Sequence, residues 1–110
     1  MPYGLKARDI EHIISAIAQI DEIAEVVLFG SRAKGNYQTG SDIDLAIKGE
    51  GVTYRSVIQL SEKLNEETPL PYFFDIVDYE QLDNICLRSH IDRIGIVTFQ
   101  ICREGMSDDA

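Results

Sequence analysis

The sequence lacks long apolar runs. No stretch of 18 or more apolar residues occurs among its 110 residues, and the N-terminus has no apolar core of the secretory type. We therefore expect neither a membrane span nor an export signal, and we predict a cytoplasmic protein. The apolar fraction of 45% is ordinary for a folded chain and too high for a disordered one.

Basic residues are also scarce. Ten Lys and Arg stand against 19 Asp and Glu, which gives a formal net charge of −9. An acidic domain repels phosphate backbones and lacks the basic patch of a nucleic-acid binder, so we expect no direct nucleic-acid partner. The excess of carboxylates suits a basic protein partner or divalent cations, and a solvated acidic surface explains most of these charges equally well.

Cysteine and histidine are too few and too scattered for a thiolate or imidazole metal centre. Cys86 and Cys102 lie 16 residues apart without metal-type spacing, and neither His12 nor His90 has a nearby partner in the sequence. Because a disulfide is unusual in a cytosolic chain, we expect buried free thiols.

The length fits one compact domain, which we place over residues 1–110 with a core at about 7–100 and a frayed polar end at 104–110. Strands that alternate with helices predict the α/β class, with a small mixed or parallel sheet and helices packed against it. Apolar periodicity and turn residues predict helices over 7–20, 54–67 and 80–91, a helical turn over 32–34, strands over 25–29, 43–47 and 72–78, and a segment over 95–101 that is either an edge strand or an extended tail.

Gly30 and Ser31 form the first motif of chemical interest. An apolar strand ends at Gly30, and Ser31 is a suitable N-cap for a helical turn. Backbone N–H groups at such a turn, together with the helix dipole, bind phosphate, and glycine permits its close approach. Taken alone, the pair is better explained as a plain turn with a cap.

Asp42 and Asp44 form the second motif. Residues two apart in a strand point to the same side, so both carboxylates would face one spot, with Ile43 turned toward the core. Adjacent acids repel each other, and a divalent cation relieves that repulsion. Oxygen-only ligands favour Mg²⁺ or Mn²⁺. The alternative is a solvated start of a strand.

Asp75 is the third element. It lies within the apolar run 72–77, where a charge is costly unless it is paired, binds a metal or lies on an edge strand. Alternation places 73, 75 and 77 on one face and 72, 74, 76 and 78 on the other, and Asp78 at the strand exit is expected to begin a turn. A phosphate site, an acid pair and a third acid together favour two-metal nucleotidyl transfer, with the third carboxylate accepting the proton.

These residues resemble a known family. Gly30 to Gly35 followed by Ser41 to Leu45 matches the pattern Gly-Ser-x10-Asp-x-Asp of the DNA polymerase beta-like nucleotidyltransferase superfamily. The similarity is closest to its minimal members, the MNT proteins, and extends over roughly 7–100. It implies the nucleotidyltransferase fold, ATP as substrate and two Mg²⁺ ions, with Mn²⁺ as the alternative.

The resemblance also implies roles for individual residues. Gly30 and Ser31 would contact the nucleotide phosphates, Asp42 and Asp44 would bind the metal ions, and Asp75 falls where the family places its third carboxylate. The catalytic and metal-binding set is therefore Asp42, Asp44 and Asp75.

Three further residues near the motif have two interpretations each. Arg32 and Lys34 would contact phosphate or make a surface or structural salt bridge. Tyr37 would flank the base or simply belong to the loop.

Many MNT proteins are encoded beside a helical HEPN protein, an RNase toxin that they neutralise by transferring AMP from ATP to a tyrosine hydroxyl. The resemblance therefore implies an antitoxin of a HEPN–MNT pair of type VII, which is a protein adenylyltransferase whose partner supplies the acceptor. Two alternatives remain: nucleotidyl transfer to a small-molecule hydroxyl, and neutralisation by binding alone with nucleotide as a ligand.

Overall fold

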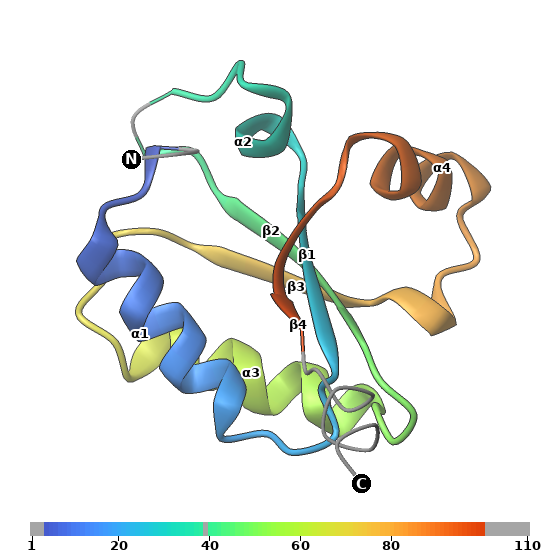
Figure 1. Ribbon diagram of the computed structural model, residues 1–110, viewed down its shortest axis with the longest axis horizontal. Helices are drawn as coiled ribbons and strands as arrows, with labels where there is room; N and C mark the ends of the chain where they lie inside the picture. The colour runs from blue at the N-terminus through green and yellow to red at the C-terminus, as the bar shows by residue number, and fades with distance from the viewer. Residues whose placement is uncertain (1–3, 39, 101–110) are drawn as a thin grey trace, which may run out of the picture.

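The computed structural model describes residues 4–38 and 40–100. Figure 1 shows a sheet with helices on both of its faces. Within the described residues, no helix is both long and apolar enough to cross a membrane. The elements are α1 (Ala7–Ala18), β1 (Glu25–Phe29), α2 (Ser31–Lys34), β2 (Ile43–Lys48), α3 (Tyr54–Glu66), β3 (Phe74–Asp78), the 3₁₀ turn η2 (Tyr79–Gln81), α4 (Ile85–Ile94) and β4 (Ile96–Gln100).

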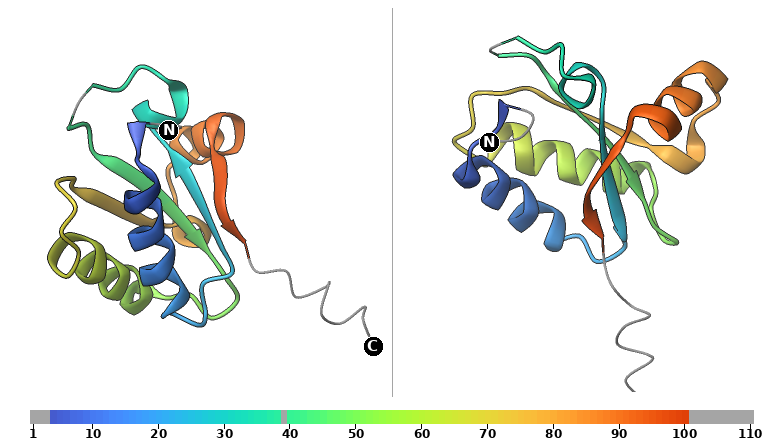
Figure 2. Two further views of the ribbon diagram at one scale, coloured as in Figure 1. Left: turned by 60° about the vertical axis from the view of Figure 1, so that its left-hand side comes forward. Right: turned by 45° about the horizontal axis from the view of Figure 1, so that its top comes forward.

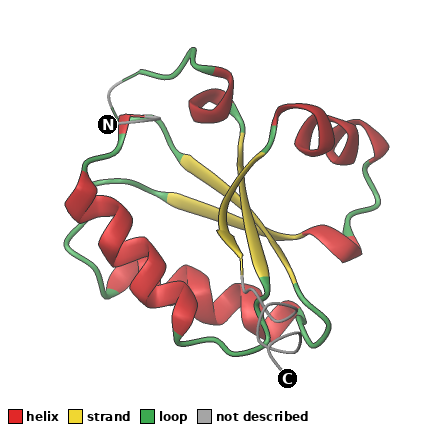
Figure 3. Cartoon of the chain, in the orientation of Figure 1, coloured by secondary structure: helices red, strands yellow, loops and turns green. Residues whose placement is uncertain are grey.

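The sheet has four strands in the order β3-β2-β1-β4. β1 is antiparallel to both β2 and β4, whereas β2 and β3 are parallel, so the predicted mixed sheet is confirmed. The segment that the sequence left open is an edge strand, β4. Helices α1 and α3 lie together on one face and α4 lies on the other, as the turned views in Figure 2 and the cartoon in Figure 3 show.

This topology brings one end of each of three strands, β1, β2 and β3, to the same edge of the sheet. Because β1 runs against β2 while β2 and β3 run together, the end of β1 lies beside the starts of β2 and β3. Phe29 is the register partner of Asp44, and Asp44 is the partner of Asp75. The residues that follow β1 and precede β2 therefore meet at the same edge of the molecule.

The main core lies between the sheet and the helices α1 and α3. Full burial of a large apolar side chain contributes about 1.5–3 kcal/mol, so this layer supplies most of the stability. A smaller cluster under α4 contains Val27, Phe29, Ala46 and Ile91. On that face the start of β3 stays open, with Asp75 exposed. The most deeply buried members of the main layer are Ile17, Ile23, Val26, Leu28, Ile43, Leu45, Ile47, Leu60, Leu64 and Phe74.

Edge strand β3 is anchored to α3 by one amide side chain. Asn65 Nδ2 donates to the carbonyl of Phe74 at 3.0 Å, and the Phe74 N–H donates to Asn65 Oδ1 at 2.7 Å. The amide pairs with this edge of β3 as a neighbouring strand would. It therefore helps to hold the register that places Asp75 beside Asp44.

The predicted helix over 80–91 is wrong at its start. Asp78 Oδ1 accepts from the Glu80 N–H at 3.1 Å and begins η2, as expected of a turn residue. A separate helix then starts at Ile85, where Asn84 Oδ1 accepts from the Leu87 N–H at 3.0 Å. These local side-chain bonds to the backbone compete with a continuous helix and divide the segment in two.

Other boundaries shift by a few residues. The predicted strand over 72–78 begins at Phe74, and the helix over 7–20 ends at Ala18. The expectation of a buried thiol is wrong for Cys86, which is exposed near the start of α4. Cys102 and the polar end at 104–110 lie outside the described residues.

Candidate active site

The predicted carboxylates lie at one end of the sheet. Asp44 and Asp75 are direct partners in the parallel pair β2–β3, so their side chains share a face. Asp42 immediately precedes β2 and is exposed. Of the explanations for a charge in this apolar run, the edge-strand position applies to Asp75. It is exposed on the open face, while its neighbours Phe74 and Ile76 are buried.

The donor set fits a hard divalent cation, since it consists of carboxylate oxygens alone. As placed in the structure, no three Asp, Glu, His or Cys side chains within residues 4–38 and 40–100 converge on a point that could hold an ion. Bringing all three carboxylates onto one ion requires rotation of the Asp42 or Asp75 side chain. Both are at the surface, where rotation meets little resistance from packing.

Electrostatics at the site favour a bound cation or proton. Burial, together with the charges of Asp75 and Asp42, raises the pKa of Asp44 above the ordinary value of 3.8, and His90 acts in the opposite direction. Burial of the carboxyl is the largest of these causes, and the repulsion exerted by the two neighbouring carboxylates adds to it.

The raised pKa predicts that ionisation of Asp44 lowers the free energy of unfolding of the metal-free protein. The folded state holds the Asp44 proton more tightly than the unfolded chain, so this stabilisation is complete below pH 3.8 and is lost as the pH rises through the folded pKa. We expect Asp44→Asn to raise Tm at pH 7 by about 1–4 °C, a small effect because the half-exposed carboxyl is screened by solvent.

The measurement is thermal unfolding with and without a chelator over a pH series. The advantage of Asp44→Asn should disappear toward pH 3.8 and should reverse at pH 7 when Mg²⁺ is added. Asp83→Asn is the matched control, since Asp83 is an exposed carboxylate outside the site. Identical pH profiles for the wild type and Asp44→Asn would contradict the prediction.

Gly30 is required by both backbone conformation and space. Its φ is +79° and its ψ −156°, and a Cβ at this position would lie 2.2 Å from Asp44 Oδ2. Gly30 occupies the N-cap position of α2, which corrects the expectation that Ser31 would do so. The reason is that this conformation is essentially restricted to glycine. Gly30 thus brings the backbone directly against a predicted metal ligand.

Gly30→Ala should damage the site more than the fold. The new Cβ displaces the Asp44 carboxylate, so we expect nucleotidyl transfer to fall by about 100-fold or more, the effect typical of a misplaced reactive group. Gly35→Ala is the matched control, because Gly35 also has positive φ, at +90°, but has nothing within 4 Å of its Cβ position. Comparable losses of activity in the two variants would contradict the steric explanation.

His90 is a site neighbour that the sequence did not predict. Its Nε2 accepts from the Gly30 N–H at 3.1 Å, and its ring meets Phe29 edge-on with centroids 6.1 Å apart. The bond joins α4 to the turn after β1 and uses the Gly30 amide that the phosphate site was expected to offer. A separation of 60 residues leaves no local pattern that could have revealed this contact.

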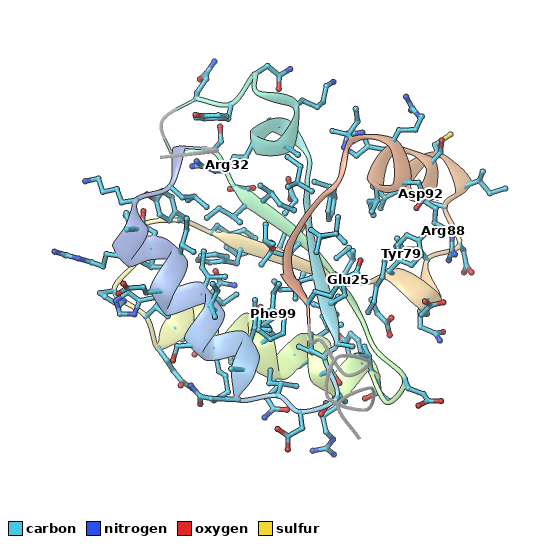
Figure 4. All side chains as sticks on the ribbon, viewed as in Figure 1. Glu25, Arg32, Tyr79, Arg88, Asp92 and Phe99 are labelled. Atoms are coloured by element: carbon cyan, nitrogen blue, oxygen red, sulfur yellow. The ribbon has the colours of Figure 1, made fainter. Side chains whose placement is uncertain are left out.

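The remaining predicted nucleotide contacts are on α2. Ser31 is half-buried at its start, and Lys34 is exposed. Arg32 is only 2% exposed, and its Nε and Nη2 donate to the carbonyl of Ser41 at 3.1 and 2.9 Å. Figure 4 shows Arg32 below α2, on the side where α1 begins. The Tyr37 ring lies against the Arg32 guanidinium, with 5.2 Å between the ring centroid and the guanidinium carbon.

Comparison with solved structures shows which folds this chain resembles. The chain is similar in fold to a chain of a toxin–antitoxin complex crystallised with AMP-PNP, with a TM-score of 0.69 and 21% identity over 89% of this chain and 78% of the other. It is likewise similar to a chain in the complex of a tri-AMPylated Shewanella oneidensis HEPN toxin with its MNT antitoxin, with a TM-score of 0.66 and 19% identity over 94% and 79% of the two chains.

Identities this low establish the fold and nothing finer. No curated protein matches the chain. The family described as "Polymerase beta, Nucleotidyltransferase" matches residues 11–103, a span that contains the Gly30 turn and all three carboxylates. This chain therefore belongs to the polymerase beta nucleotidyltransferase family.

Proposed function

We propose that this chain is the antitoxin of a HEPN–MNT pair of type VII and transfers AMP from ATP to a tyrosine hydroxyl of a HEPN RNase toxin. The observation that carries the proposal is the complete set of three carboxylates, with Asp44 and Asp75 paired on the open face of the sheet beside Gly30. Solved complexes of this fold supply the partner class, since one contains a HEPN toxin that carries AMP groups.

At phosphorus the transfer forms one bond and breaks one, and the hydroxyl proton moves to a carboxylate. The tyrosine oxygen attacks the α-phosphorus of ATP, the bond from that phosphorus to the bridging oxygen breaks, and pyrophosphate leaves. Asp75 is exposed at the site and accepts the hydroxyl proton. The carboxylates of Asp42, Asp44 and Asp75 would hold two Mg²⁺ ions, or Mn²⁺, which when bound neutralise the triphosphate and polarise the α-phosphorus.

The residues around the Gly30 turn bind the nucleotide in this proposal. The Ser31 hydroxyl and the first amides of α2 face the phosphates, since the first-turn N–H groups of a helix have no partner within it. Lys34 is an exposed cation on the same helix and contacts phosphate as a point charge. Gly30 keeps side-chain atoms out of the space between this turn and Asp44.

The partner would be a basic protein in the cytoplasm. The formal net charge of −9 favours association with a cationic surface such as that of an RNase and disfavours direct binding of nucleic acid. The HEPN protein supplies the acceptor tyrosine and the surface that orients it.

The test is incubation with α-labelled ATP, Mg²⁺ and the HEPN protein encoded beside this chain. We expect label on the HEPN protein, and none with Asp42→Ala or Asp44→Ala. Label on a small hydroxyl compound alone would support the small-molecule alternative. Full neutralisation of the toxin in cells by both variants would mean that binding suffices, and no transfer by folded wild-type protein would refute the proposal.

A further inference from the structure

Arg32 is a buried cation held by several groups around it. Burying a guanidinium is costly unless hydrogen bonds and polar neighbours compensate. Two of its nitrogens donate to the Ser41 carbonyl, and its central carbon lies 5.2 and 5.0 Å from the ring centroids of Tyr37 and Tyr72. Gly4 packs against it as well, since a Cβ there would lie 2.8 Å from Arg32 Nη1. The Arg32 side chain is thus enclosed by groups from several parts of the fold.

The carbonyl that Arg32 holds belongs to the peptide entering Asp42. On the other side of Asp42, the Ile43 N–H donates to the carbonyl of Phe73 at 2.9 Å. The backbone of Asp42 is therefore held before and after the residue. Arg32 supplies the first of these two restraints, and β-sheet pairing supplies the second.

The loop before Asp42 needs such a restraint. Gly35 and Gly40 both have positive φ, and glycine gives a loop many alternative conformations. Gln38 and Ser41 bond to each other within the loop, which shapes its tip without fixing it to the rest of the molecule. The bond from Arg32 connects the loop to α2.

The same cluster is connected to α1. Tyr72, whose ring faces Arg32, donates its hydroxyl to Asp9 Oδ2 at 2.8 Å, and the Lys6 N–H donates to the same oxygen at 3.0 Å. Arg32 therefore contacts a ring that is itself hydrogen-bonded to α1. This connection limits the movement of Arg32, and so of the Ser41 carbonyl that it binds.

We propose that Arg32 is a positioning residue for the metal site: it fixes the Ser41–Asp42 peptide, and so the origin of the Asp42 carboxylate, and does not itself bind nucleotide. The inference rests on the proposed function for the role of Asp42 as a metal ligand. An exposure of 2% leaves the guanidinium no surface for a phosphate while the loop is in place. Loss of a group that orients a ligand typically weakens metal binding by about 10–100-fold.

The experiment uses the full chain and Mn²⁺ alone, measured by calorimetry or by electron paramagnetic resonance, with KM for ATP as a second readout. Arg32→Lys keeps the charge but loses the two-point donation. We expect its Mn²⁺ affinity to fall by about 10-fold or more, with KM for ATP at saturating metal within about 2-fold of wild type. Arg55→Lys, an exposed arginine on α3, is the matched control and should change neither value.

A second variant covers the case in which Arg32→Lys does not fold. Tyr37→Leu removes one ring from the cluster and leaves the bonds to Ser41, so Mn²⁺ affinity should fall by a smaller factor, about 2- to 5-fold, in keeping with the loss of one cation–π contact. Unchanged Mn²⁺ affinity in the folded variants, or a rise in KM for ATP alone, would overturn the proposal. Because Mn²⁺ binding needs no acceptor, this result is independent of whether a HEPN protein is the substrate.

Discussion

Replacing Asp44 with alanine should abolish nucleotidyl transfer, with a fall in kcat of about 10²–10³-fold or more, the range seen when one preorganised electrostatic group is removed from an active site. Asp44 is adjacent to both of the other carboxylates: it is the register partner of Asp75 and lies two residues after Asp42. No other described side chain occupies that central position. The measurement is the rate of label transfer from α-labelled ATP at saturating Mg²⁺.

The control for this variant is Asp83→Ala, which removes an exposed carboxylate outside the site. It should retain full activity. Circular dichroism should show that Asp44→Ala keeps its secondary structure, because the side chain makes no contribution to the apolar core. Residual activity within about 10-fold of wild type would contradict the assignment of Asp44 as a central ligand.

Phe74→Ala should cost about 3–5 kcal/mol of the free energy of unfolding, the usual range for a large aromatic truncated in a core. Phe74 is 1% exposed, and its ring meets Tyr72 edge-on with centroids 6.5 Å apart. Domains of this size are stable by only about 5–15 kcal/mol, so the variant will be close to unfolding at 37 °C. The measurement is equilibrium unfolding in urea at 25 °C.

Phe73→Ala is the matched control on the neighbouring position. Phe73 is 58% exposed, so we expect a cost below about 1 kcal/mol. The pair tests which face of β3 is buried, since Phe74 and Asp75 necessarily point to opposite sides. Equal losses in the two variants would contradict the observed register and, with it, the exposure of Asp75 on the open face.

The pairing of Asp42 with Asp44 could be predicted from the sequence because its information is local. Asp42 and Asp44 are two residues apart at the start of a strand, and alternation places them on one side without reference to the rest of the chain. The alternation 73/75/77 against 72/74/76 likewise predicted that Phe74 and Asp75 lie on opposite faces, and the burial of Phe74 and Ile76 beside an exposed Asp75 agrees with it.

Local patterns failed where short-range hydrogen bonds compete with apolar periodicity. The run 80–91 has apolar residues at helical spacing, yet Asp78 and Asn84 divide it into a 3₁₀ turn and a later helix. The error arises because a cap is decided by the geometry of a single side chain. The expectation of a buried thiol at Cys86 was separately wrong, since Cys86 is exposed near the start of α4.

The sequence by itself determined the α/β class, a sheet with helices packed against it, and the Gly30, Asp42 and Asp44 motif, because strand and helix periodicities are properties of neighbouring residues. The tertiary structure alone decided that Asp75 stands opposite Asp44, that His90 bonds to Gly30, and that Arg32 holds the Ser41 carbonyl. The first two depend on strand pairing and on the packing of α4, and the third on a loop closing over a buried cation. Each is set by the balance of burial and hydrogen bonding across the whole fold, which short-range spacing does not encode.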